Sequence, residues 1–553
     1  MTTPHLTTPA EDLGFALARV VDLPGLAATA GAPLGPDEIA AVLEEADRLA
    51  RERIAPGRQE ADRHGAVLEQ APPEDRGDGG NWPAVRTPPH YRDLYRAWIE
   101  GGWQGLTAEP GHGGQGLPQT LWSAVMELVS SADMAFGLCP LLSMGAIEAL
   151  QHAATPAQRE RWLPHLVSGE WTGTMCLTEP QAGSDLGALR TRAVPDGRGG
   201  YALHGQKIFI TWGEHDLAAN TLHLVLARLP DAPPGSRGIS LFVAPKVLPD
   251  GRRNALGCGG LERKMGIHAS PTCVMLFEGA EAELVGEPNR GLAAMFVMMN
   301  AARLGVGVEG VGQGARAVAL AEAYAAGREQ GGRPIAEYPD VARMLREMRS
   351  VTLAARLLAL EASVALDRAR LLGDAAAAAR IALLTPIVKA WCTDRGIDVA
   401  SLGVQVHGGA GFTEDAGAAQ VLRDARIAPI YEGTNGIQAI DLVVRKVARD
   451  SGAAMRALLA EARGVEPRVD AALAALERAT ALVLAAQARD PAAAEGVAAA
   501  YLDACGWVLG GWMLARAAAA EGGAERYGAL AEFYLGRLLP RAAARIAEVE
   551  VAG

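Results

Sequence analysis

The chain has 553 residues, which is too many for one hydrophobic core, so about three or four domains are expected. A hydrophobic content of 49% with 21% charged residues is typical of a soluble globular protein. The net charge of −12 argues against a nucleic acid or an anionic membrane as the main partner. Six scattered cysteines without a CxxC pair indicate buried thiols in a reducing cytoplasm, and they suggest neither a zinc site nor a disulfide framework.

The chain begins with a polar segment. Residues 1–10 are rich in Pro and Thr and lack the basic and apolar parts of a signal peptide. We predict a loose N-terminal extension over residues 1–35. The longest apolar run, Ala504–Ala515, is too short to cross a bilayer, so we expect a core helix there and no transmembrane segment.

The next region has the apolar spacing of helices. Residues 69–86 are rich in Pro, Gly and Asp, which indicates a surface loop. The run GHGGQG at 111–116 follows no strand, so it is not interpreted as a dinucleotide fingerprint. Helices are predicted over 36–55, 91–101, 121–148 and 156–167. Residues 36–170 are therefore predicted to form an N-terminal helical domain.

The pattern changes to short strands at Trp171. Turn sequences such as DGRGG at 196–200 separate runs rich in β-branched and aromatic residues. Strands are predicted over 171–177, 201–203, 207–211, 222–227, 238–243 and 272–277. Strands this short with turns this frequent favour a small β-barrel or sandwich, so residues 171–287 are predicted to be a middle β domain.

Helical spacing returns and continues to the end of the chain. Residues 288–450 are predicted to form a C-terminal helical bundle with breaks near 331–339 and 408–411. Residues 451–553 are rich in alanine and are predicted to form an additional helical domain with turns near 464, 491 and 522–523. The fold class is therefore α+β and multi-domain.

Two motifs belong to the middle region. Thr178–Asp185 (TEPQAGSD) is a loop of small, hydrogen-bonding residues that could hold a polar ligand edge or a phosphate, although ordinary turns use the same residues. In the run GQKIFITWG at 205–213, strand alternation would place Phe209 and Thr211 on one face. That pair would suit a flat heteroaromatic ring, and cross-strand packing is an equally good interpretation.

Two further motifs belong to the C-terminal half. Gln405–Phe412 (QVHGGAGF) would let the backbone approach a cofactor, or it simply ends a helix. In the run PIYEGTNGIQ at 429–438, Glu432 lies between an aromatic residue and Gly433. Partial burial would raise the pKa of this carboxyl towards the range of a catalytic base. Alternatively, Thr434 or Asn435 caps a helix and Glu432 is merely exposed near its start.

These four motifs, in this order and between these domains, resemble the acyl-CoA dehydrogenases, flavoproteins that oxidise acyl thioesters. The resemblance runs from about Glu38 to Asp450. It is closest to a longer subgroup that carries an extra C-terminal helical domain. Members of that subgroup act on acyl-CoAs of various lengths, and some act on 3-methylthiopropanoyl-CoA.

The resemblance implies roles for particular residues. Glu432 would be the catalytic base. Substrate contacts would come from Ser184, Asn300, Arg303 and Gly433. FAD contacts would come from Met175, Leu177, Thr178, Ser184, Phe209, Thr211, Arg328, Gln405, Gly408, Gly409, Thr434 and Gly436. Three positions depart from many relatives, which have Trp at Phe209, Asp at Asn300 and an aromatic residue beside the adenine at Gly331.

The resemblance also implies the reaction. Glu432 would take the α-proton while the β-hydride moves to flavin N5, giving the trans-2-enoyl-CoA of fatty acid β-oxidation. In the family, the backbone N–H of the catalytic glutamate and a ribityl hydroxyl of FAD stabilise the enolate oxygen. Arg328 and Gln405–Gly409 would bind the FAD of a neighbouring subunit, so we expect a homodimer or a larger homo-oligomer. We also expect a cytoplasmic enzyme that an electron-transfer flavoprotein reoxidises.

Three alternatives remain at the level of sequence. An acyl-CoA oxidase would carry out the same half-reaction with oxygen as the acceptor. A DNA-associated flavoprotein of related fold would need a basic tail, but residues 455–551 hold ten basic and twelve acidic side chains. A catalytically silent scaffold fits poorly with an intact Glu432. Acyl chain length depends on the depth of a pocket expected between helices at 123–154 and 295–308, which the sequence does not reveal.

Overall fold

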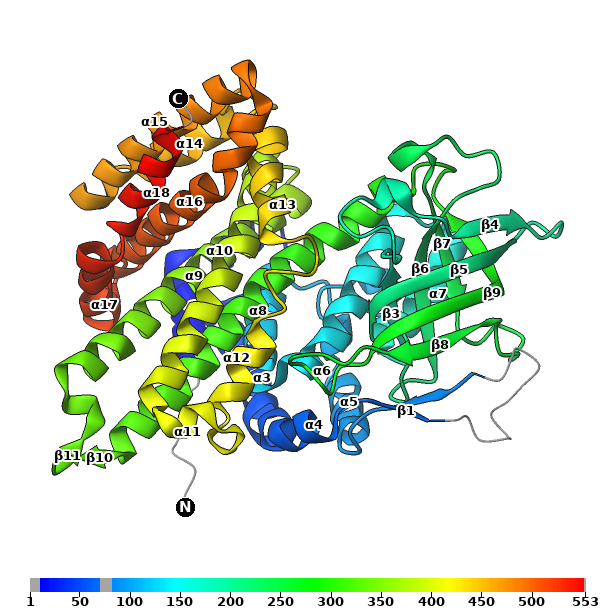
Figure 1. The fold of residues 1–553 in the computed structure, drawn as a ribbon, viewed down its shortest axis with the longest axis horizontal. Coiled ribbons are helices and arrows are strands. Elements are labelled where there is room, and N and C mark those ends of the chain that lie inside the picture. Colours follow the sequence, from blue (N-terminus) through cyan, green and yellow to red (C-terminus); the bar gives the residue numbers. More distant parts are fainter. Residues whose placement is uncertain (1–9, 70–81, 552–553) are drawn as a thin grey trace. The chain divides into compact units, whose positions relative to one another are not determined.

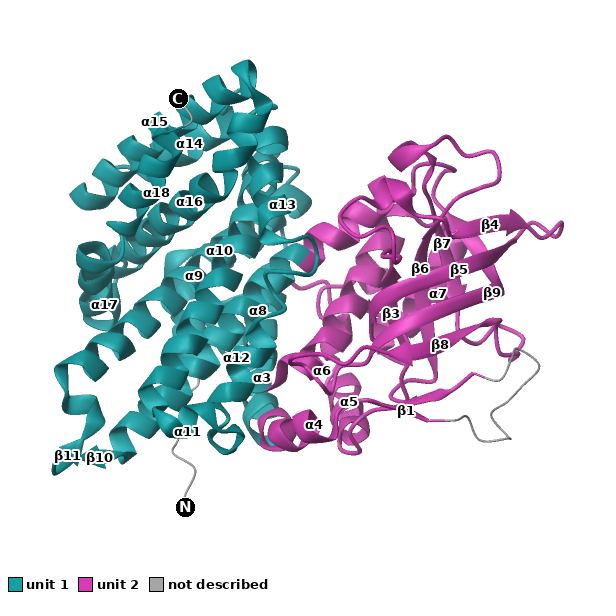
Figure 2. Cartoon of the chain, viewed as in Figure 1, with its two compact units in different colours: residues 1–52, 118–132, 303–553 teal, residues 53–117, 133–302 magenta. Residues whose placement is uncertain are grey.

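The computed structural model describes residues 10–69 and 82–551. The segment without signal-peptide features and most of the loop predicted at 69–86 lie outside the described residues. The chain divides into two compact units, coloured separately in Figure 2. Unit 1 comprises residues 1–52, 118–132 and 303–553, and unit 2 comprises residues 53–117 and 133–302. The predicted division into five segments is finer than these units and stays a prediction.

Unit 2 is built on a seven-stranded sheet within its described residues (Figure 1). The strands pair in the order β3-β6-β7-β9-β5-β4, with β8 added to β9, and only β3 and β6 run parallel. Their bounds are β3 Trp171–Cys176, β4 Arg192–Pro195, β5 Tyr201–Thr211, β6 Asn220–Ala227, β7 Ser240–Pro245, β8 Leu256–Leu261 and β9 Thr272–Val285.

The sheet curves back towards itself. The long strand β9 pairs with β7 near its end and with β5 and β8 along the rest. Past β3, the carbonyl of Thr178 accepts from the amide of Ile208 at 2.9 Å. Beside β4, the amide of Ala193 donates to Arg228 at 2.8 Å. Buried side chains including Phe242, Met275 and Phe277 fill the interior, which confirms the predicted middle β domain.

The strand predictions differ from the structure most clearly in four places. β9 continues to Val285, eight residues beyond the predicted end at 277. β5 is one strand where two were predicted, because the chain passes Gly205 without leaving the ladder. β4 (RAVP) is short and ends in proline, and β8 (LGCGGL) is rich in glycine, so neither has a strand-like sequence. Both are strands because β5 and β9 pair with them.

Helices and one small hairpin accompany this sheet in unit 2. The helices are α4 Arg58–His64, α5 Tyr91–Glu100 and α7 Pro156–Ser168, and the hairpin pairs β1 Val67–Glu69 with β2 Ala84–Arg86. The long helix α6, Gln119–Ala153, begins in unit 1 and leaves helical conformation at Asp133 (φ −155°, ψ 103°), where its part in unit 2 starts. The Asp133 carboxylate accepts from the amide of Ala135 at 3.0 Å and from the Tyr91 hydroxyl at 2.6 Å. This side chain therefore restarts the helix, a break that the helical spacing did not predict.

Apart from one short hairpin, the regular structure of unit 1 is helical in its described residues. Its C-terminal half begins within α8 and consists of α8 Gly291–Gly327, α9 Pro339–Leu371, α10 Ala375–His407, α11 Gly409–Phe412, α12 Ala418–Ala425, α13 Asn435–Ile440, a π-helical stretch Asp441–Val447, α14 Ala453–Glu461, α15 Pro467–Arg489, α16 Pro491–Ala519, α17 Gly523–Arg537 and α18 Arg541–Glu550. Between α8 and α9 lies the short hairpin of β10 Glu329–Gln330 and β11 Arg333–Pro334. The predicted breaks at 331–339 and 408–411 coincide with the ends of α8 and α10.

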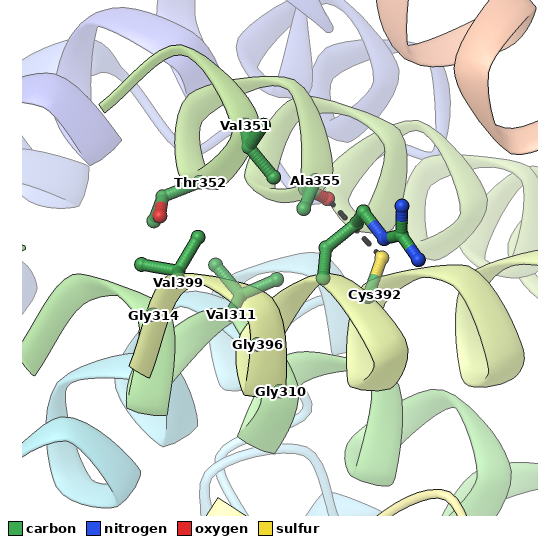
Figure 3. A pocket seen from close by; sticks show the side chains of 10 residues that line it. Gly310, Val311, Gly314, Val351, Thr352, Ala355, Cys392, Gly396 and Val399 are labelled. Carbon is green, nitrogen blue, oxygen red and sulfur yellow. Dashed lines mark hydrogen bonds between the residues drawn. The ribbon is translucent and has the colours of Figure 1, made fainter. Parts of the chain in front are cut away.

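Helices α8 and α10 approach each other closely through glycines. A Cβ atom at Gly310 would lie 2.7 Å from the carbonyl oxygen of Cys392, and one at Gly396 would lie 2.5 Å from that of Gly310. Figure 3 shows the narrow gap at this crossing, which has no room for a water molecule. Its lining comes from α8, α9 and α10: Gly310, Val311, Gly314, Val351, Thr352, Ala355, Cys392, Arg395, Gly396 and Val399. Because the glycines let these two helices pack closely, Glu309 of α8 and Lys389 of α10 lie on adjacent helices.

The prediction of a loose start was wrong for the described part of residues 1–35. Residues 10–29 form α1 Ala10–Phe15, a π-helical turn Ala16–Val20 and α2 Leu23–Thr29. Leu13 and Leu17 are fully buried. The Asp12 carboxylate accepts from Arg526 at 2.6 Å, and the Phe15 ring lies 5.4 Å from that of Tyr527. The segment folds because the C-terminal helices of the same unit supply a partner surface. The next helix, α3 Pro36–Leu49, was predicted.

Four helices in the described part of the chain are long and apolar enough to cross a membrane by length and composition: α6, α8, α10 and α16. Their most apolar windows are 94%, 56%, 61% and 78% buried inside the structure, respectively. Residues 504–515 belong to α16 and are buried, as predicted for a core helix. All six cysteines are buried and free.

Candidate active site

The turn that carries Glu432 joins α12 to α13 and has an unusual backbone. Glu432 has φ +55° and Gly433 has φ +87°, so two successive residues are left-handed. A non-glycine residue in this region is strained and persists only when its surroundings hold it. At Gly433, a Cβ atom would also lie 2.7 Å from the Gln438 side-chain nitrogen. The backbone conformation therefore favours glycine here, and a larger residue would also have to displace the Gln438 side chain.

Side chains from α8 and α10 hold this turn. The Lys389 ammonium donates to the carbonyl of Gly433 at 2.7 Å and to the side-chain oxygen of Asn435 at 2.9 Å. The Arg303 guanidinium donates to the carbonyl of Glu432 at 3.3 Å. Both carbonyls of the left-handed pair are thus bonded by cations. The backbone N–H of Glu432 donates to no acceptor among the described residues.

The helix-start interpretation of this motif is correct in one respect. Thr434 caps α13, and its hydroxyl accepts from the amide of Ile437 at 3.3 Å. Glu432, however, is partly buried rather than simply exposed. Burial raises the pKa of its carboxyl above the ordinary value, and the charges of Arg303 and Lys389 oppose that rise. Burial lowers the pKa of Lys389 to about 7, against the opposing charges of Glu432 and Asp394.

In unit 2, a buried carboxylate anchors the TEPQAGSD loop. Glu179 accepts from the amides of Arg190 at 2.6 Å and Thr191 at 3.0 Å, and from the Lys207 ammonium at 2.8 Å. Burial alone would raise the pKa of Glu179, but the Lys207 charge and these hydrogen bonds lower it to about 2. The anchored loop leaves Ser184 exposed and Thr178 partly exposed.

Phe209 lies at a bulge in β5, which breaks the alternation between Lys207 and Phe209; the shared face of Phe209 and Thr211 stays a prediction. Lys207 pairs with Met275 and Ile210 with Cys273, which inserts one extra residue into β5. Phe209 takes φ +59° and is 58% exposed, whereas Lys207 and Ile210 are both buried. The aromatic ring is presented by the bulge and not by strand periodicity.

Several residues of unit 2 offer groups that could contact a flat ring. Phe209 offers an exposed aromatic face, and the hydroxyls of Thr178, Ser184 and Thr211 make no hydrogen bond to a described residue. Met175 is buried at 7% exposure on β3, and Leu177 follows that strand. A flat heteroaromatic ligand with hydrogen-bonding edges would use such groups, and the predicted role of these residues stays a prediction. The predicted substrate residue Asn300 is exposed on α8.

The remaining predicted residues lie at the far ends of α8 and α10. Arg328 directly follows α8, and Gln405, Gly408 and Gly409 surround the end of α10; all four are exposed. The rings of Tyr324 and His407 stack at 4.4 Å between centroids and join these two helix ends. Within one chain, the structure thus groups Arg328 with Gln405–Gly409 and separates them from the Glu432 turn.

Sequence reasoning missed the residues that support these groups. Lys389, Gln438 and Asn435 hold the Glu432 turn, and Glu179 with Lys207 holds the TEPQAGSD loop. One usable signal was present, because the chain has only five lysines among 52 basic residues. Lys207 and Lys389 are both fully buried, so two of the five lysines are structural ammonium donors.

Comparisons with known proteins agree with this architecture. Family models described as the acyl-CoA dehydrogenase N-terminal, middle and C-terminal domains match residues 81–170, 174–280 and 289–447, respectively. A fourth, described as acetyl-CoA dehydrogenase C-terminal like, matches residues 444–553. The chain therefore belongs to the acyl-CoA dehydrogenase family.

Individual relatives extend this result. The chain is 43% identical to the 3-methylmercaptopropionyl-CoA dehydrogenase of Ruegeria pomeroyi, over 95% of this chain and 93% of that protein. Its fold resembles Caenorhabditis elegans ACDH-11 in complex with C11-CoA, with a TM-score of 0.77, 22% identity and coverage of 96% and 91%. It also resembles an acyl-CoA dehydrogenase of Bacillus anthracis complexed with FAD, with a TM-score of 0.75, 22% identity and coverage of 93% and 88%.

Family membership defines the activity. The protein is an FAD-dependent oxidoreductase that converts an acyl-CoA thioester into an enoyl-CoA by α,β-dehydrogenation. The alternatives of an oxidase and of a DNA-associated flavoprotein are not favoured.

Proposed function

We propose that Glu432 is the base that removes the α-proton of the acyl-CoA. The observation that carries this proposal is a partly buried carboxyl on a strained turn, with a raised pKa and two cations beside it. Burial strengthens the base, while Arg303 and Lys389 keep it ionised. A strained backbone that the surrounding hydrogen bonds hold in place is a common property of catalytic residues.

The same turn would stabilise the developing enolate. The N–H of Glu432 has no acceptor among the described residues, so it is free to donate to the thioester oxygen of a bound substrate. Lys389 and Arg303 bond the two carbonyls of the turn and so fix the direction of its N–H groups. Ser184, Asn300, Arg303 and Gly433 are the proposed substrate contacts.

The residues of unit 2 would hold the flavin. We assign Met175, Leu177, Thr178, Ser184, Phe209 and Thr211 to that role, together with Thr434 and Gly436 of the base turn. When bound, FAD supplies the hydride acceptor. The aromatic face and the hydroxyls of this chain would orient the ring and exclude water from it.

We propose a homo-oligomer, and the length of α8 supports this proposal. At about 1.5 Å per residue, α8 places Arg328 about 37 Å from Arg303, whose guanidinium bonds the Glu432 turn of the same chain. Arg328, Gln405, Gly408 and Gly409 would therefore bind the FAD of a second copy of the chain. We further propose that the enzyme works in the cytoplasm, in a β-oxidation type of reaction, and that an electron-transfer flavoprotein reoxidises it.

We propose that the substrate belongs to the class of 3-methylmercaptopropionyl-CoA. The support is the 43% identity over nearly the whole of both chains, including the additional helical domain. A panel of straight-chain acyl-CoAs and 3-methylmercaptopropionyl-CoA, assayed with a dye acceptor, tests this proposal. We expect the highest kcat/KM for 3-methylmercaptopropionyl-CoA and for straight chains of similar length. A clear preference for long chains would contradict it.

A further inference from the structure

We propose that Glu309 is a positioning residue for the dehydrogenation, acting through Tyr431 on the turn that carries Glu432. This inference rests on the proposed role of Glu432 as the base. Glu309 lies on α8 and is only 2% exposed. One of its carboxyl oxygens is hydrogen-bonded to the hydroxyl of Tyr431, the residue directly before Glu432. Its other oxygen has no partner among the described residues.

The surroundings of Glu309 leave it without a counter-ion. Among the described residues, no Lys or Arg forms an ion pair with it. The nearby Lys389 directs its hydrogen bonds to Gly433 and Asn435 instead. A buried carboxyl without a paired cation keeps its proton, because the charged form loses its hydration. Glu309 is therefore a neutral acid in the folded protein at neutral pH.

The titratable groups that face Glu309 agree with this state. Burial raises the pKa of Glu309 to about 8; the charge of Glu432 adds to the rise, and the Tyr431 hydrogen bond and Lys389 oppose it. The two carboxyls are thus in different environments: Glu432 faces Arg303 and Lys389, and Glu309 faces a phenol. Such a difference assigns different roles to neighbouring acids. Because Glu309 is neutral, it does not compete with Glu432 for the charges of Arg303 and of Lys389 in its protonated form.

Glu309 completes the support of the strained turn. Lys389 and Asn435 hold the turn on the C-terminal side of Glu432. On the N-terminal side, the Tyr431 amide donates to the carbonyl of Ile427 at 3.2 Å, and the Tyr431 hydroxyl is bound to Glu309. Without the Glu309 contact, the ring of Tyr431 would be free to move, and the left-handed Glu432 would lose support on that side.

The test compares four holoenzyme variants by anaerobic stopped-flow reduction of the flavin: Glu309→Gln, Glu309→Leu, Tyr431→Phe and the double variant Glu309→Leu/Tyr431→Phe. Glu309→Gln keeps a neutral hydrogen-bonding group, so we expect rates close to those of the wild type at neutral pH. Glu309→Leu and Tyr431→Phe each break the contact, and we expect each to slow reduction roughly 10- to 100-fold through misplacement of the base. The double variant should be no slower than either single variant, because both remove the same contact.

Two pH measurements separate positioning from a merely structural role. Lys389 titrates near pH 7 in both enzymes, and the wild-type rate should show a further ionisation near pH 8 that Glu309→Gln lacks. The second measurement is thermal unfolding. Between pH 4.5, the pKa of a glutamate in the unfolded chain, and about 8, the pKa of Glu309 in the folded protein, Glu309 is protonated only in the native state. Wild-type stability due to this group therefore falls as pH rises through that window. The Tm of Glu309→Gln minus the Tm of the wild type should therefore increase as the pH rises through this window.

Three outcomes would overturn the proposal: additive effects in the double variant, a Glu309→Leu enzyme with wild-type rates, or a Glu309→Gln enzyme as slow as Glu432→Gln. Measuring Glu432→Gln in the same series keeps the two hypotheses apart. Fast flavin reduction in that variant would refute the assignment of Glu432 as the base. Slow flavin reduction in Glu432→Gln, together with additive effects of Glu309→Leu and Tyr431→Phe, would refute only the positioning role of Glu309.

Discussion

Lys389 controls part of the charge that Glu432 experiences. Its ammonium lies beside the turn, and its charge opposes the rise in the pKa of Glu432. The base must be ionised to accept a proton, so the rate of flavin reduction falls on the acid side of its pKa. Over that acid range Lys389 itself is protonated, because its pKa is about 7.

We therefore predict that Lys389→Met moves the acid limb of the pH profile to higher pH. Loss of the cation raises the pKa of Glu432, so a larger fraction of the base is protonated at a given acid pH. The measurement is the rate constant of flavin reduction as a function of pH. Lys264→Met serves as the control, because Lys264 donates to Ser270 in the other compact unit. An unchanged acid limb in Lys389→Met would show that this cation does not act on the base.

At the residue scale, the sequence motif was sufficient to single out Glu432 and Gly433. It could not reveal the left-handed backbone at Glu432, because that conformation depends on Lys389, Arg303 and Gln438. Two of these residues are more than 40 positions away in the chain. A strained turn is a property of the packed structure, and local spacing does not encode it.

At the scale of elements, the bulge in β5 presents Phe209 to solvent. The side chain is 58% exposed, so it contributes little to the core. Stacking between a heteroaromatic base and an aromatic side chain contributes about 1–3 kcal/mol. A loss of about 1.4 kcal/mol corresponds to a tenfold change in affinity.

We expect Phe209→Ala to weaken FAD binding roughly tenfold or more, with little change in Tm, and Phe209→Trp to retain binding. Titration of the apoprotein with FAD, followed by fluorescence, measures the affinity. Val194→Ala is a matched control, since Val194 is an exposed apolar residue of the same sheet at 40% exposure. If Phe209→Ala bound FAD with the affinity of the wild type, Phe209 would not be part of the flavin site.

Helices with a repeated apolar spacing over many residues were predicted correctly. Strands that form only because a neighbouring strand pairs with them were not. The helices at Tyr91–Glu100 and Pro156–Ser168 were predicted almost residue by residue. The strand β8 has three glycines in six residues, and only its neighbour β9 makes it a strand. The bulge at Phe209 was missed for the same reason, because register belongs to the pair of strands and not to one of them.

At the scale of the whole molecule, the N-terminal segment shows what a sequence leaves open. Residues 10–29 have apolar positions at Leu13, Leu17 and Leu23, but their partner surface lies some 500 residues later. A short helix is marginal alone, and tertiary packing supplies its stability. The domain order and the family, in contrast, were predictable from motifs and their sequence alone.

The proposed oligomer makes a further prediction at this scale. Arg328→Ala should lower FAD occupancy and weaken self-association together, because one residue would serve both. Sedimentation velocity with detection at the flavin band measures the two quantities at once. Arg537→Ala, an exposed arginine of α17 in the same unit, is the control. A stable monomer with full FAD occupancy would show that the cofactor site is complete within one chain.

The most direct test of the account is anaerobic stopped-flow bleaching of the flavin by acyl-CoA in Glu432→Gln. The substitution keeps size and hydrogen bonding but removes the base, so the variant should fold and bind both FAD and acyl-CoA. We predict that flavin reduction slows by at least about 10⁴-fold, at or beyond the upper end for loss of a general base. Glu414→Gln, an exposed glutamate of the same unit, should reduce at the wild-type rate. Near-normal bleaching by Glu432→Gln would mean that another group takes the α-proton and would contradict the assignment of the base.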